Sequence, residues 1–290
     1  MIRPLFHVLT TGYKVAYQRL GQGSRKAFFL HGFPGSFHQG LYLENFCAEF
    51  DLEVITFNRP GYGGSENWRQ SPSLGDISQI FTELARLHSW DQFHIIAVSG
   101  GTPYAIRAAV DLSKEVLSLN VVCGLGILNE PEFKETFSAS TIGLMNLANR
   151  TPERVLNLMV QSKVQKIVRE QSFGKGILPG LFSADRETLA NSQVSKSLAA
   201  SLGEAFSQGT SGAKRDLQNY LGSWQVPWGQ ITCPTHFWHG DKDGIVPCAN
   251  AEIYHRRIPH SKLTMLANEG HYSLAIRRMH DVLTEIPRLP

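Results

Sequence analysis

Two kinds of hydrophobic pattern alternate along most of this chain. Short apolar runs rich in β-branched and aromatic residues indicate buried strands, in the order KAFFL, EVITF, FHIIAV, LNVVCGLGIL, PTHFW and KLTML. An earlier stretch, FHVLTTGYKVAYQRL, indicates a hairpin that turns near Thr11 and Gly12. Apolar residues at every third or fourth position indicate helices at 37–50, 77–87, 104–112, 249–257 and 273–286. Strands that alternate with helices need crossovers, so we expect an α/β fold whose mostly parallel central sheet is covered by helices on both faces.

The alternation stops in the middle of the chain. From 131 to 220 the apolar positions keep a helical spacing, as at 155–168 and 187–206, and no run typical of a strand occurs. The simplest account is one core interrupted by a helical insertion. The chain therefore divides into an α/β core made of residues 1–130 and 221–290 and a helical cap, or lid, made of residues 131–220.

Ser99 stands at the end of the run FHIIAV and is followed at once by two glycines. The carboxyl ends of parallel strands are where open α/β sheets carry their chemistry. A serine that turns sharply there from a strand into a helix exposes its hydroxyl and crowds the residues two positions away, which are the small Ala97 and Gly101. Pro103 suits the first turn of the helix that follows. This stretch alone leaves open a glycine-rich turn with an incidental serine.

Five motifs resemble, in the same order, those of the α/β-hydrolase family. They are HGFPGS at 31–36, NRPGYGGSE at 58–66, AVSGG at 97–101, HGDKDGIVP at 239–247 and NEGHYSL at 268–274. Two positions depart from the family pattern. Ala97 replaces the first glycine of G-x-S-x-G, and Asn58 stands where the family often has aspartate. We infer no loss of catalysis from Asn58.

The resemblance implies a serine hydrolase that works through a Ser–His–Asp triad. A serine hydroxyl needs a base within hydrogen-bond reach, and the base needs a third group that orients it. By the family's motifs, Ser99 would be the nucleophile, His271 the base and Asp243 the acid, in the chain order that this fold uses. The backbone amides of Phe33 and Gly100 would form the oxyanion hole, and the Phe33 side chain could line the acyl pocket.

Other acids and histidines compete for these roles. Asp241 lies two residues before Asp243, and the family's spacing to the proline that follows favours Asp243. Some relatives carry the acid after an earlier strand, where this chain has Glu130. His94 and His239 lie in or at the end of strand runs, and we interpret both as structural.

A helical cap over the catalytic edge would roof a largely apolar pocket, an expectation that rests on the fold. The side chains that could line this pocket are Phe133, Phe137, Met145, Leu181, Phe182, Trp224 and Trp228. The alternative is that these side chains pack the cap's own helices. A roofed pocket favours small or medium acyl substrates over polymers.

The resemblance makes a carboxylic ester the first candidate substrate. The same triad could instead cleave a C–C bond, a lactone or a peptide, and a binding protein could keep this fold without turnover. Relatives with an aspartate nucleophile cleave epoxides or carbon–halogen bonds. Ser99 argues against both reactions, because an alkylated serine would be difficult to regenerate.

Composition argues against several other classes of function. The chain has 290 residues and is 42% hydrophobic, which suits one sizeable core. Its net charge is +3 and no dense Lys/Arg run occurs, so we expect no nucleic-acid or membrane-surface partner. No glycine loop is followed by G-K-[ST] or completes G-x-G-x-x-G, and carboxylates are few around Asp241 and Asp243. We therefore predict no nucleotide, no other cofactor and no metal.

Cysteine usage and hydropathy bear on location. Cys47, Cys123, Cys233 and Cys248 are scattered without a C-x-x-C, which is typical of reduced thiols in a cytoplasmic protein. No apolar stretch reaches the roughly 20 residues that a membrane span needs. The beginning of the sequence has no long apolar segment, so we expect no signal peptide. The sequence predicts nothing about oligomeric state.

Overall fold

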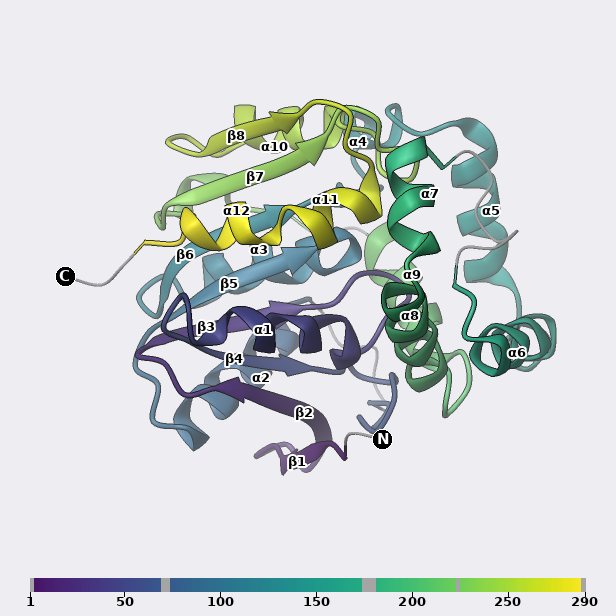
Figure 1. The fold of residues 1–290 in the computed structure, drawn as a ribbon, viewed down its shortest axis with the longest axis horizontal. Helices are drawn as coiled ribbons and strands as arrows, with labels where there is room; N and C mark the ends of the chain where they lie inside the picture. Colours follow the sequence, from purple (N-terminus) through teal and green to yellow (C-terminus); the bar gives the residue numbers. More distant parts are fainter. Residues whose placement is uncertain (1–2, 69–73, 174–180, 223–224, 288–290) are drawn as a thin grey trace.

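One twisted sheet organises the part of the chain that the computed structural model describes, residues 3–68, 74–173, 181–222 and 225–287 (Figure 1). It has eight strands in the order β1-β2-β4-β3-β5-β6-β7-β8. Their bounds are β1 Leu5–Val8, β2 Lys14–Gly21, β3 Arg25–Leu30, β4 Leu52–Phe57, β5 Phe93–Val98, β6 Val116–Val122, β7 Thr235–Gly240 and β8 Lys262–Leu266. β1 and β2 form the predicted hairpin, β2 is antiparallel to β4, and all the remaining pairs are parallel. The predicted mostly parallel sheet is confirmed.

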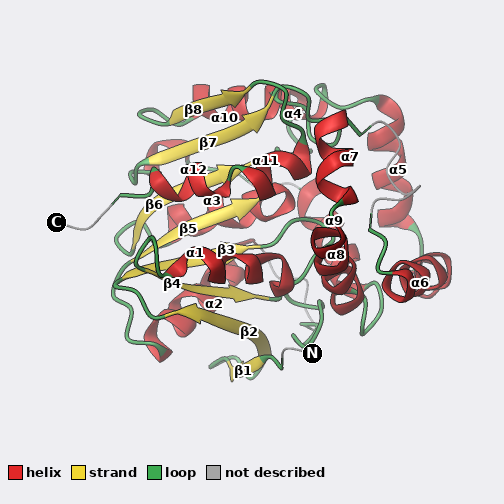
Figure 2. Cartoon of the chain, in the orientation of Figure 1, coloured by secondary structure: helices red, strands yellow, loops and turns green. Residues whose placement is uncertain are grey.

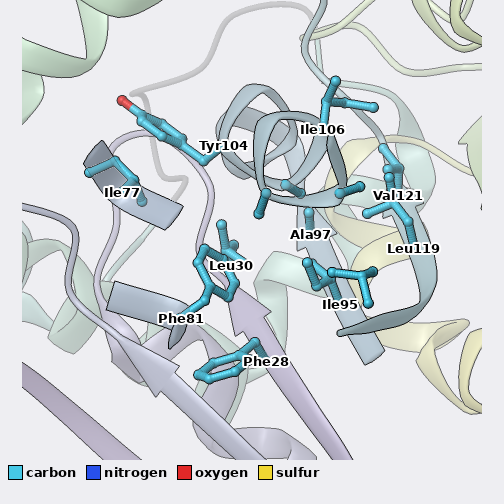
Figure 3. Close-up of a cluster of buried hydrophobic side chains, with 14 of the residues drawn as sticks. Phe28, Leu30, Ile77, Phe81, Ile95, Ala97, Tyr104, Ile106, Leu119 and Val121 are labelled. Carbon is cyan, nitrogen blue, oxygen red and sulfur yellow. The ribbon is translucent and has the colours of Figure 1, made fainter. Parts of the chain in front are cut away.

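Helices cover both faces of the sheet (Figures 1 and 2). The helices on one face are α2 Leu74–Leu87, α3 Thr102–Asp111 and α10 Ala249–Arg257. The elements on the other face are the 3₁₀ helix η1 Phe37–Leu43 and the helices α1 Glu44–Cys47, α11 His271–Arg277 and α12 Met279–Thr284. Side chains of a strand alternate between the two faces. Phe28 and Leu30 therefore belong to one apolar cluster (Figure 3), and Phe29 belongs to the cluster on the other face. Phe28 lies edge-on to Phe81 of α2, with 4.9 Å between ring centroids.

Three predicted helices are interrupted in the structure. The stretch 37–50 begins as η1 and only then becomes α1, and the stretch 273–286 is divided at Arg278 into α11 and α12. The stretch 187–206 is two helices, α7 Ser183–Ala190 and α8 Ser192–Ala205. The division falls at Asn191, whose side chain accepts the amides of Gln193 and Val194 and so caps a new helix. The run LNVVCGLGIL leaves the sheet after Val122.

Helices also fill the chain between β6 and β7. The short helix α4 Pro131–Lys134 packs on α10 through Phe133 and Tyr254, whose ring centroids are 4.7 Å apart. The five helices after it, called the cap helices below, are α5 Ala139–Arg150, α6 Glu153–Glu170, α7, α8 and α9 Ser211–Leu221. They lie beyond the carboxyl ends of the parallel strands (Figure 1), and no described residue from 131 to 222 is in a strand. The exact division into core and cap stays a prediction.

Membrane spans and disulfides are both absent from the described part of the chain. No helix there combines the length and the apolar composition needed to cross a bilayer. The four cysteines all lie in that part and none is in a disulfide; Cys47 and Cys123 are buried.

Candidate active site

Ser99 lies in a strained turn between β5 and α3. Its φ is +52°, in the left-handed region, and it begins the 3₁₀ turn η2 Ser99–Gly101. The strand side of the turn is fully buried at Ala97. On the helix side, a Cβ added to Gly101 would lie 2.9 Å from the carbonyl oxygen of Leu30 and 3.0 Å from that of His31. The sharp turn predicted from small residues on both sides of Ser99 is therefore present.

Asp243 and His271 come together from two loops at the same edge of the sheet. Asp243 follows β7, and its Oδ2 lies 2.7 Å from Nδ1 of His271, the first residue of α11. The other oxygen, Oδ1, accepts the backbone amides of Ile245 and Val246, each at 2.9 Å. Because a carboxylate only accepts, Nδ1 of His271 carries the proton and Nε2 is left as the acceptor.

Burial and ion pairing act in opposite directions on this pair. The Asp243 side chain is fully buried, which by itself would raise the pKa of the carboxyl group, but His271 and His239 together hold that pKa below its ordinary range. For His271, burial acts to lower the pKa, and Asp243, joined by Asp185, raises it above the ordinary 6.5. The arrangement thus stabilises an imidazolium next to an ionised carboxylate.

One cavity of about 430 Å³ connects His271 with Ser99, since both residues line it. Ser99 is 8% exposed, and its Oγ has no hydrogen-bond partner among the residues that the structure describes. The hydroxyl is therefore available for a bond to His271 Nε2 or to a bound molecule. Catalytic hydrogen bonds of this kind often tighten only when substrate is present.

The competing acids lie apart from His271. Asp241 is partly exposed and accepts the backbone amide of Asn268. Glu130 forms an ion pair with Arg257 of α10. Neither carboxylate contacts the imidazole, whereas Asp243 does.

The two other histidines differ from each other. His94 is buried in β5, bonds to Ser118 Oγ at 2.8 Å, and has a pKa that burial lowers to about 4. His239 is fully buried, and its Nε2 lies 2.9 Å from the carbonyl oxygen of Val246 and 3.3 Å from Asp243 Oδ2. We expected His239 to be structural. Its contact with Asp243 adds a support for the carboxylate that the sequence did not predict.

The segments that carry Phe33 and Gly100 approach each other closely. A Cβ added to Gly100 would lie 3.2 Å from the Phe33 backbone nitrogen and 2.6 Å from the Phe33 Cβ. The Phe33 amide has no acceptor among the described residues. Gln39 Oε1 fixes the loop by accepting the Gly32 amide at 2.7 Å, and Tyr220 OH donates to the Gly100 carbonyl at 2.8 Å. Two backbone amides are thus held next to Ser99.

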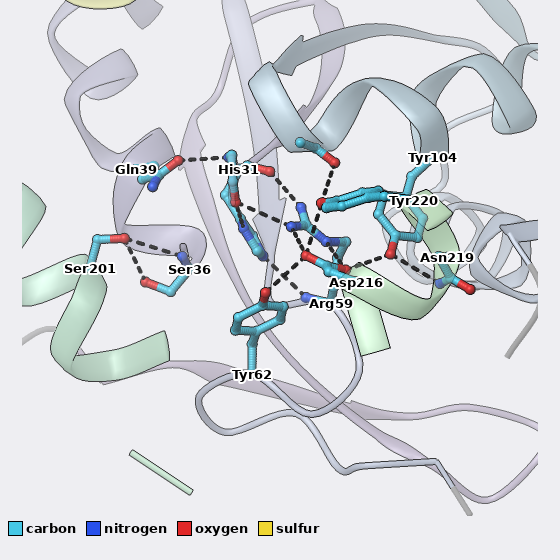
Figure 4. A network of polar contacts seen from close by, with 12 residues as sticks. His31, Ser36, Gln39, Arg59, Tyr62, Tyr104, Ser201, Asp216, Asn219 and Tyr220 are labelled. Atoms are coloured by element: carbon cyan, nitrogen blue, oxygen red, sulfur yellow. Dashed lines mark hydrogen bonds and ion pairs between the residues drawn. The ribbon is translucent and has the colours of Figure 1, made fainter. Parts of the chain in front are cut away.

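A buried ion pair supports this loop from below (Figure 4). The Arg59 guanidinium donates to Asp216 of α9 and to the carbonyl oxygens of His31 and Gly32. Three tyrosine hydroxyls surround the same carboxylate, those of Tyr62, Tyr104 and Tyr220. Burial raises the pKa of each tyrosine well above 10, so all three stay protonated donors. The sequence does not predict this network, because Asp216 is one polar position among several in a helical pattern.

The cavity is lined by other residues than the sequence predicted. None of the six described candidates lines it. Phe133 packs against α10, while Phe137, Met145 and Trp228 pack against the apolar cluster of the core. Leu181 and Phe182 also lie outside the lining, and Trp224 lies outside the described residues. The lining residues that the cap contributes are Phe173, Gln193, Val194, Ser197, Leu198 and Leu202. Helix α8 thus contributes all of these cap residues except Phe173.

One group of side chains has the composition of a metal site. Cys123, His239 and Asp243 bring ligand atoms within 4.8 Å of one another. Each has another partner, however. Asp243 bonds to His271 and to two amides, His239 Nε2 is near the Val246 carbonyl, and burial raises the pKa of the Cys123 thiol well above its ordinary value. These residues fit the support of a carboxylate better than a metal, and the expectation of no metal stays a prediction.

The fold agrees with the family that the sequence matches. A family model described as the alpha/beta hydrolase fold matches residues 28–276, a range that contains all five motifs. Because the match covers most of the chain, the protein belongs to the alpha/beta hydrolase fold family.

Two curated relatives are similar over most of the chain. A monoacylglycerol lipase of Mus musculus is 25% identical over an alignment of 276 positions that covers 89% of this chain and 74% of the lipase. A poly(3-hydroxyalkanoate) depolymerase of Ectopseudomonas oleovorans is 26% identical over 232 residues, 78% of this chain and 71% of the depolymerase.

Solved structures share the fold at lower identity. A bromoperoxidase from Bacillus anthracis superposes with a TM-score of 0.74 at 16% identity, covering 98% of this chain and all of the other. An esterase from Exiguobacterium antarcticum superposes with a TM-score of 0.72 at 18% identity, covering 96% of each chain. At such identities the likeness concerns the fold alone.

Proposed function

We propose that this protein is a serine hydrolase that cleaves a carboxylic ester of a small or medium acyl group. One observation carries the proposal: His271, whose Nδ1 lies 2.7 Å from Asp243 Oδ2, lines the same cavity as Ser99. A hydroxyl on a strained turn, an oriented imidazole and a buried carboxylate are the three groups that nucleophilic acyl transfer requires. No cofactor takes part in the proposed reaction, and we propose a cytoplasmic location.

The proposed reaction has two halves. Ser99 Oγ attacks the acyl carbon while His271 Nε2 takes its proton, and Asp243 stabilises the imidazolium that forms. The amides of Phe33 and Gly100 donate to the oxyanion of the tetrahedral intermediate. His271 then protonates the leaving alkoxide, which leaves an acyl ester on Ser99. Water attacks this ester by the same route and releases the acid.

The cavity and the relatives both support an ester substrate. A cavity of about 430 Å³ with aromatic and aliphatic walls suits a medium acyl chain, and Gln39, Asn45 and Gln193 add polar groups to its lining. The two curated relatives are named as a monoacylglycerol lipase and a poly(3-hydroxyalkanoate) depolymerase, and a monoacylglycerol contains a carboxylic ester. C–C bonds, lactones and peptides remain rival substrates for the same three residues.

Labelling and a substrate panel test the proposal together. A fluorophosphonate should modify the folded wild type, and p-nitrophenyl esters of graded chain length should be hydrolysed fastest at a short or medium length. Ser99→Ala should abolish both signals, while Ser162→Ala, an exposed serine on α6, should leave both unchanged.

Three results would count against the proposal. Absent labelling would favour a binding protein that has lost turnover. Labelling together with faster cleavage of a vinylogous diketone or an aminopeptidase substrate than of any ester would identify a C–C bond or a peptide bond as the substrate bond. Full esterase activity in Ser99→Ala would remove Ser99 from the role of nucleophile.

A further inference from the structure

A second buried carboxylate lies close to His271, and the proposed reaction does not use it. Asp185 belongs to cap helix α7 and is fully buried. Its Oδ2 accepts the His271 amide at 3.0 Å, and its Oδ1 accepts the amides of Tyr272 and Ser273, each at 2.8 Å. One side chain from the cap thus binds three consecutive amides that begin with His271.

These amides are the ones that a helix cannot satisfy by itself. The first N–H groups of a helix have no partner in the helix, and the residue just before it normally supplies a side-chain acceptor. Before α11 that residue is Gly270, which has no side chain. A Cβ added to Gly270 would lie 2.4 Å from Asp185 Oδ2, so the glycine leaves the space that the carboxylate occupies. The helix cap that is ordinarily local comes here from 86 residues away in sequence.

We propose that Asp185 is a positioning residue that holds the backbone of His271 in place for the reaction. The position of His271 then depends on how cap helix α7 packs against α11. This inference rests on the proposed function. Asp243 holds the imidazole of His271 from the core side, and Asp185 holds the main chain of the same residue from the cap side. Hydrogen bonds to a carboxylate are stronger than bonds between neutral groups. Both the imidazole and the main chain of His271 are therefore held firmly.

The charge of Asp185 has a second, measurable effect. The titratable and charged groups around His271 are Asp243 after β7, Asp185 on α7, Tyr272 beside it, Cys123 after β6 and, through Asp243, His239. Burial raises the pKa values of Cys123 and Tyr272, which keeps both groups neutral near pH 7. Asp185 therefore joins Asp243 in raising the pKa of His271, and removal of its charge should lower that pKa.

The first experiment compares Asp185→Asn with a control on the same pair of helices. Asn is close in shape but uncharged, and its NH₂ group would face amide donors. We expect kcat for the best p-nitrophenyl ester to fall about 10- to 100-fold with a smaller change in KM, since slight misplacement of a catalytic group is costly. The acid limb of kcat/KM should move to lower pH. Glu187→Gln removes the exposed 3.4 Å ion pair to Arg277 between the same helices and should change kcat less than twofold.

A second variant keeps the test decisive if Asp185→Asn folds poorly. Gly270 has extended backbone angles that other residues can adopt. Gly270→Asp, combined with Asp185→Ala, therefore puts a carboxylate at the local capping position. The new side chain would fill the space that the Asp185 carboxylate leaves. We expect Asp185→Ala to lose activity or folding and the double variant to regain a large part of both. A folded double variant as inactive as Asp185→Ala would refute the capping role.

The outcome for Asp185 can be separated from the outcome for the proposed function. Folded Asp185→Asn with wild-type kcat, KM and pH limb would overturn the positioning role and leave esterase activity intact. If the wild type hydrolyses nothing, NMR titration of the His271 imidazole still decides, because its pKa should be lower in Asp185→Asn than in the wild type. An unchanged titration would reject the inference in either case.

Discussion

The Asp243 carboxylate receives contacts from two histidines and two backbone amides, and no other described acid touches the imidazole of His271. Asp243→Asn keeps the shape but favours the wrong imidazole tautomer, so kcat should fall about 10⁴-fold. Asp241→Asn changes a partly exposed carboxylate that accepts the Asn268 amide and lies 3.5 Å from Lys242 Nζ. Neither partner belongs to the proposed triad, so kcat should stay within about twofold of the wild type. Steady-state kinetics on one ester suffices. A larger loss in Asp241→Asn than in Asp243→Asn would transfer the role.

Gly100 offers a test of the oxyanion amides at the same scale. An added methyl group would lie 2.5 Å from Tyr220 OH and 2.6 Å from the Phe33 Cβ, so the two segments must separate. Gly100→Ala should lower kcat by about 10²–10³-fold, the typical effect of one lost oxyanion donor.

Gly143→Ala is the matched control for Gly100→Ala. Gly143 lies in helix α5 with open space around its Cβ position, so this variant should keep its kcat and become slightly more stable. Equal kcat in Gly100→Ala and the wild type would mean that the loop does not bind the oxyanion.

At the scale of elements, the ion pair between Arg59 and Asp216 joins cap helix α9 to the loops under the site. Both side chains are at most 2% exposed. Asp216→Asn leaves a buried guanidinium without its counter-charge, which typically costs about 3–5 kcal/mol in the free energy of unfolding. Urea denaturation measures this.

The control for Asp216→Asn is Glu285→Gln, which removes an exposed pair with Lys262 at 3.4 Å and should cost less than about 1 kcal/mol. Similar costs for the two variants would mean that the buried pair does not anchor α9.

The sequence predicted the elements better than their interruptions. Strand runs and helix spacing suffice for the order and the parallel sheet, because period-2 and period-3.6 patterns are set locally. The division at Asn191 depends on one side chain that caps a new helix, and a continuous helical pattern conceals it. Gly124 and Gly126 follow β6 where the apolar run continues, so hydrophobicity alone overextended that strand.

Local motifs likewise predict only part of the candidate site. Ser99, Asp243 and His271 stand in short motifs that can be found without a fold. Asp185 and Asp216 cannot be found in that way. Each is one acid in a helix, and only the packing of that helix decides whether the carboxylate faces water or a buried partner. The apolar residues Phe133 and Trp228 were misplaced for the same reason, since they pack on the core.

At the scale of the whole molecule, buried carboxylates set the response to acid. Glu53 pairs with Arg19 and Lys26, and Glu83 accepts two bonds from Thr10 at 2.7 and 2.9 Å. Burial alone would raise the pKa of each, but these partners lower both pKa values below 4.5, as His271 and His239 do for Asp243 below 3.8. A lowered pKa gives stability that is complete above the unfolded-state value and is lost as the pH falls through the folded-state value.

The free energy of unfolding should therefore fall as the pH drops below about 6.5, because burial keeps His94 neutral in the fold while the unfolded chain binds a proton there. It should fall more steeply below about pH 4.5, where the carboxylates add their loss. Urea denaturation at a series of pH values measures this free energy. In Glu83→Gln it should fall less steeply over the acid range, because one carboxylate with a lowered pKa has been removed. Stability that stays level down to pH 3 would contradict these shifts.

The two buried carboxylates of the cap also restrict how a molecule can reach Ser99. Asp185 lies on α7 and binds the start of α11. Asp216 lies on α9 and binds Arg59, in the loop after β4, and Tyr104 of α3. A rigid-body movement of both helices away from the core would separate the Arg59 guanidinium from its counter-ion. It would also leave the three amides at the start of α11 without their acceptor, and both losses are costly for buried groups. We therefore expect substrate to enter the cavity, and product to leave it, while both helices stay packed on the core. The movement needed would be small displacements of the side chains at the cavity entrance.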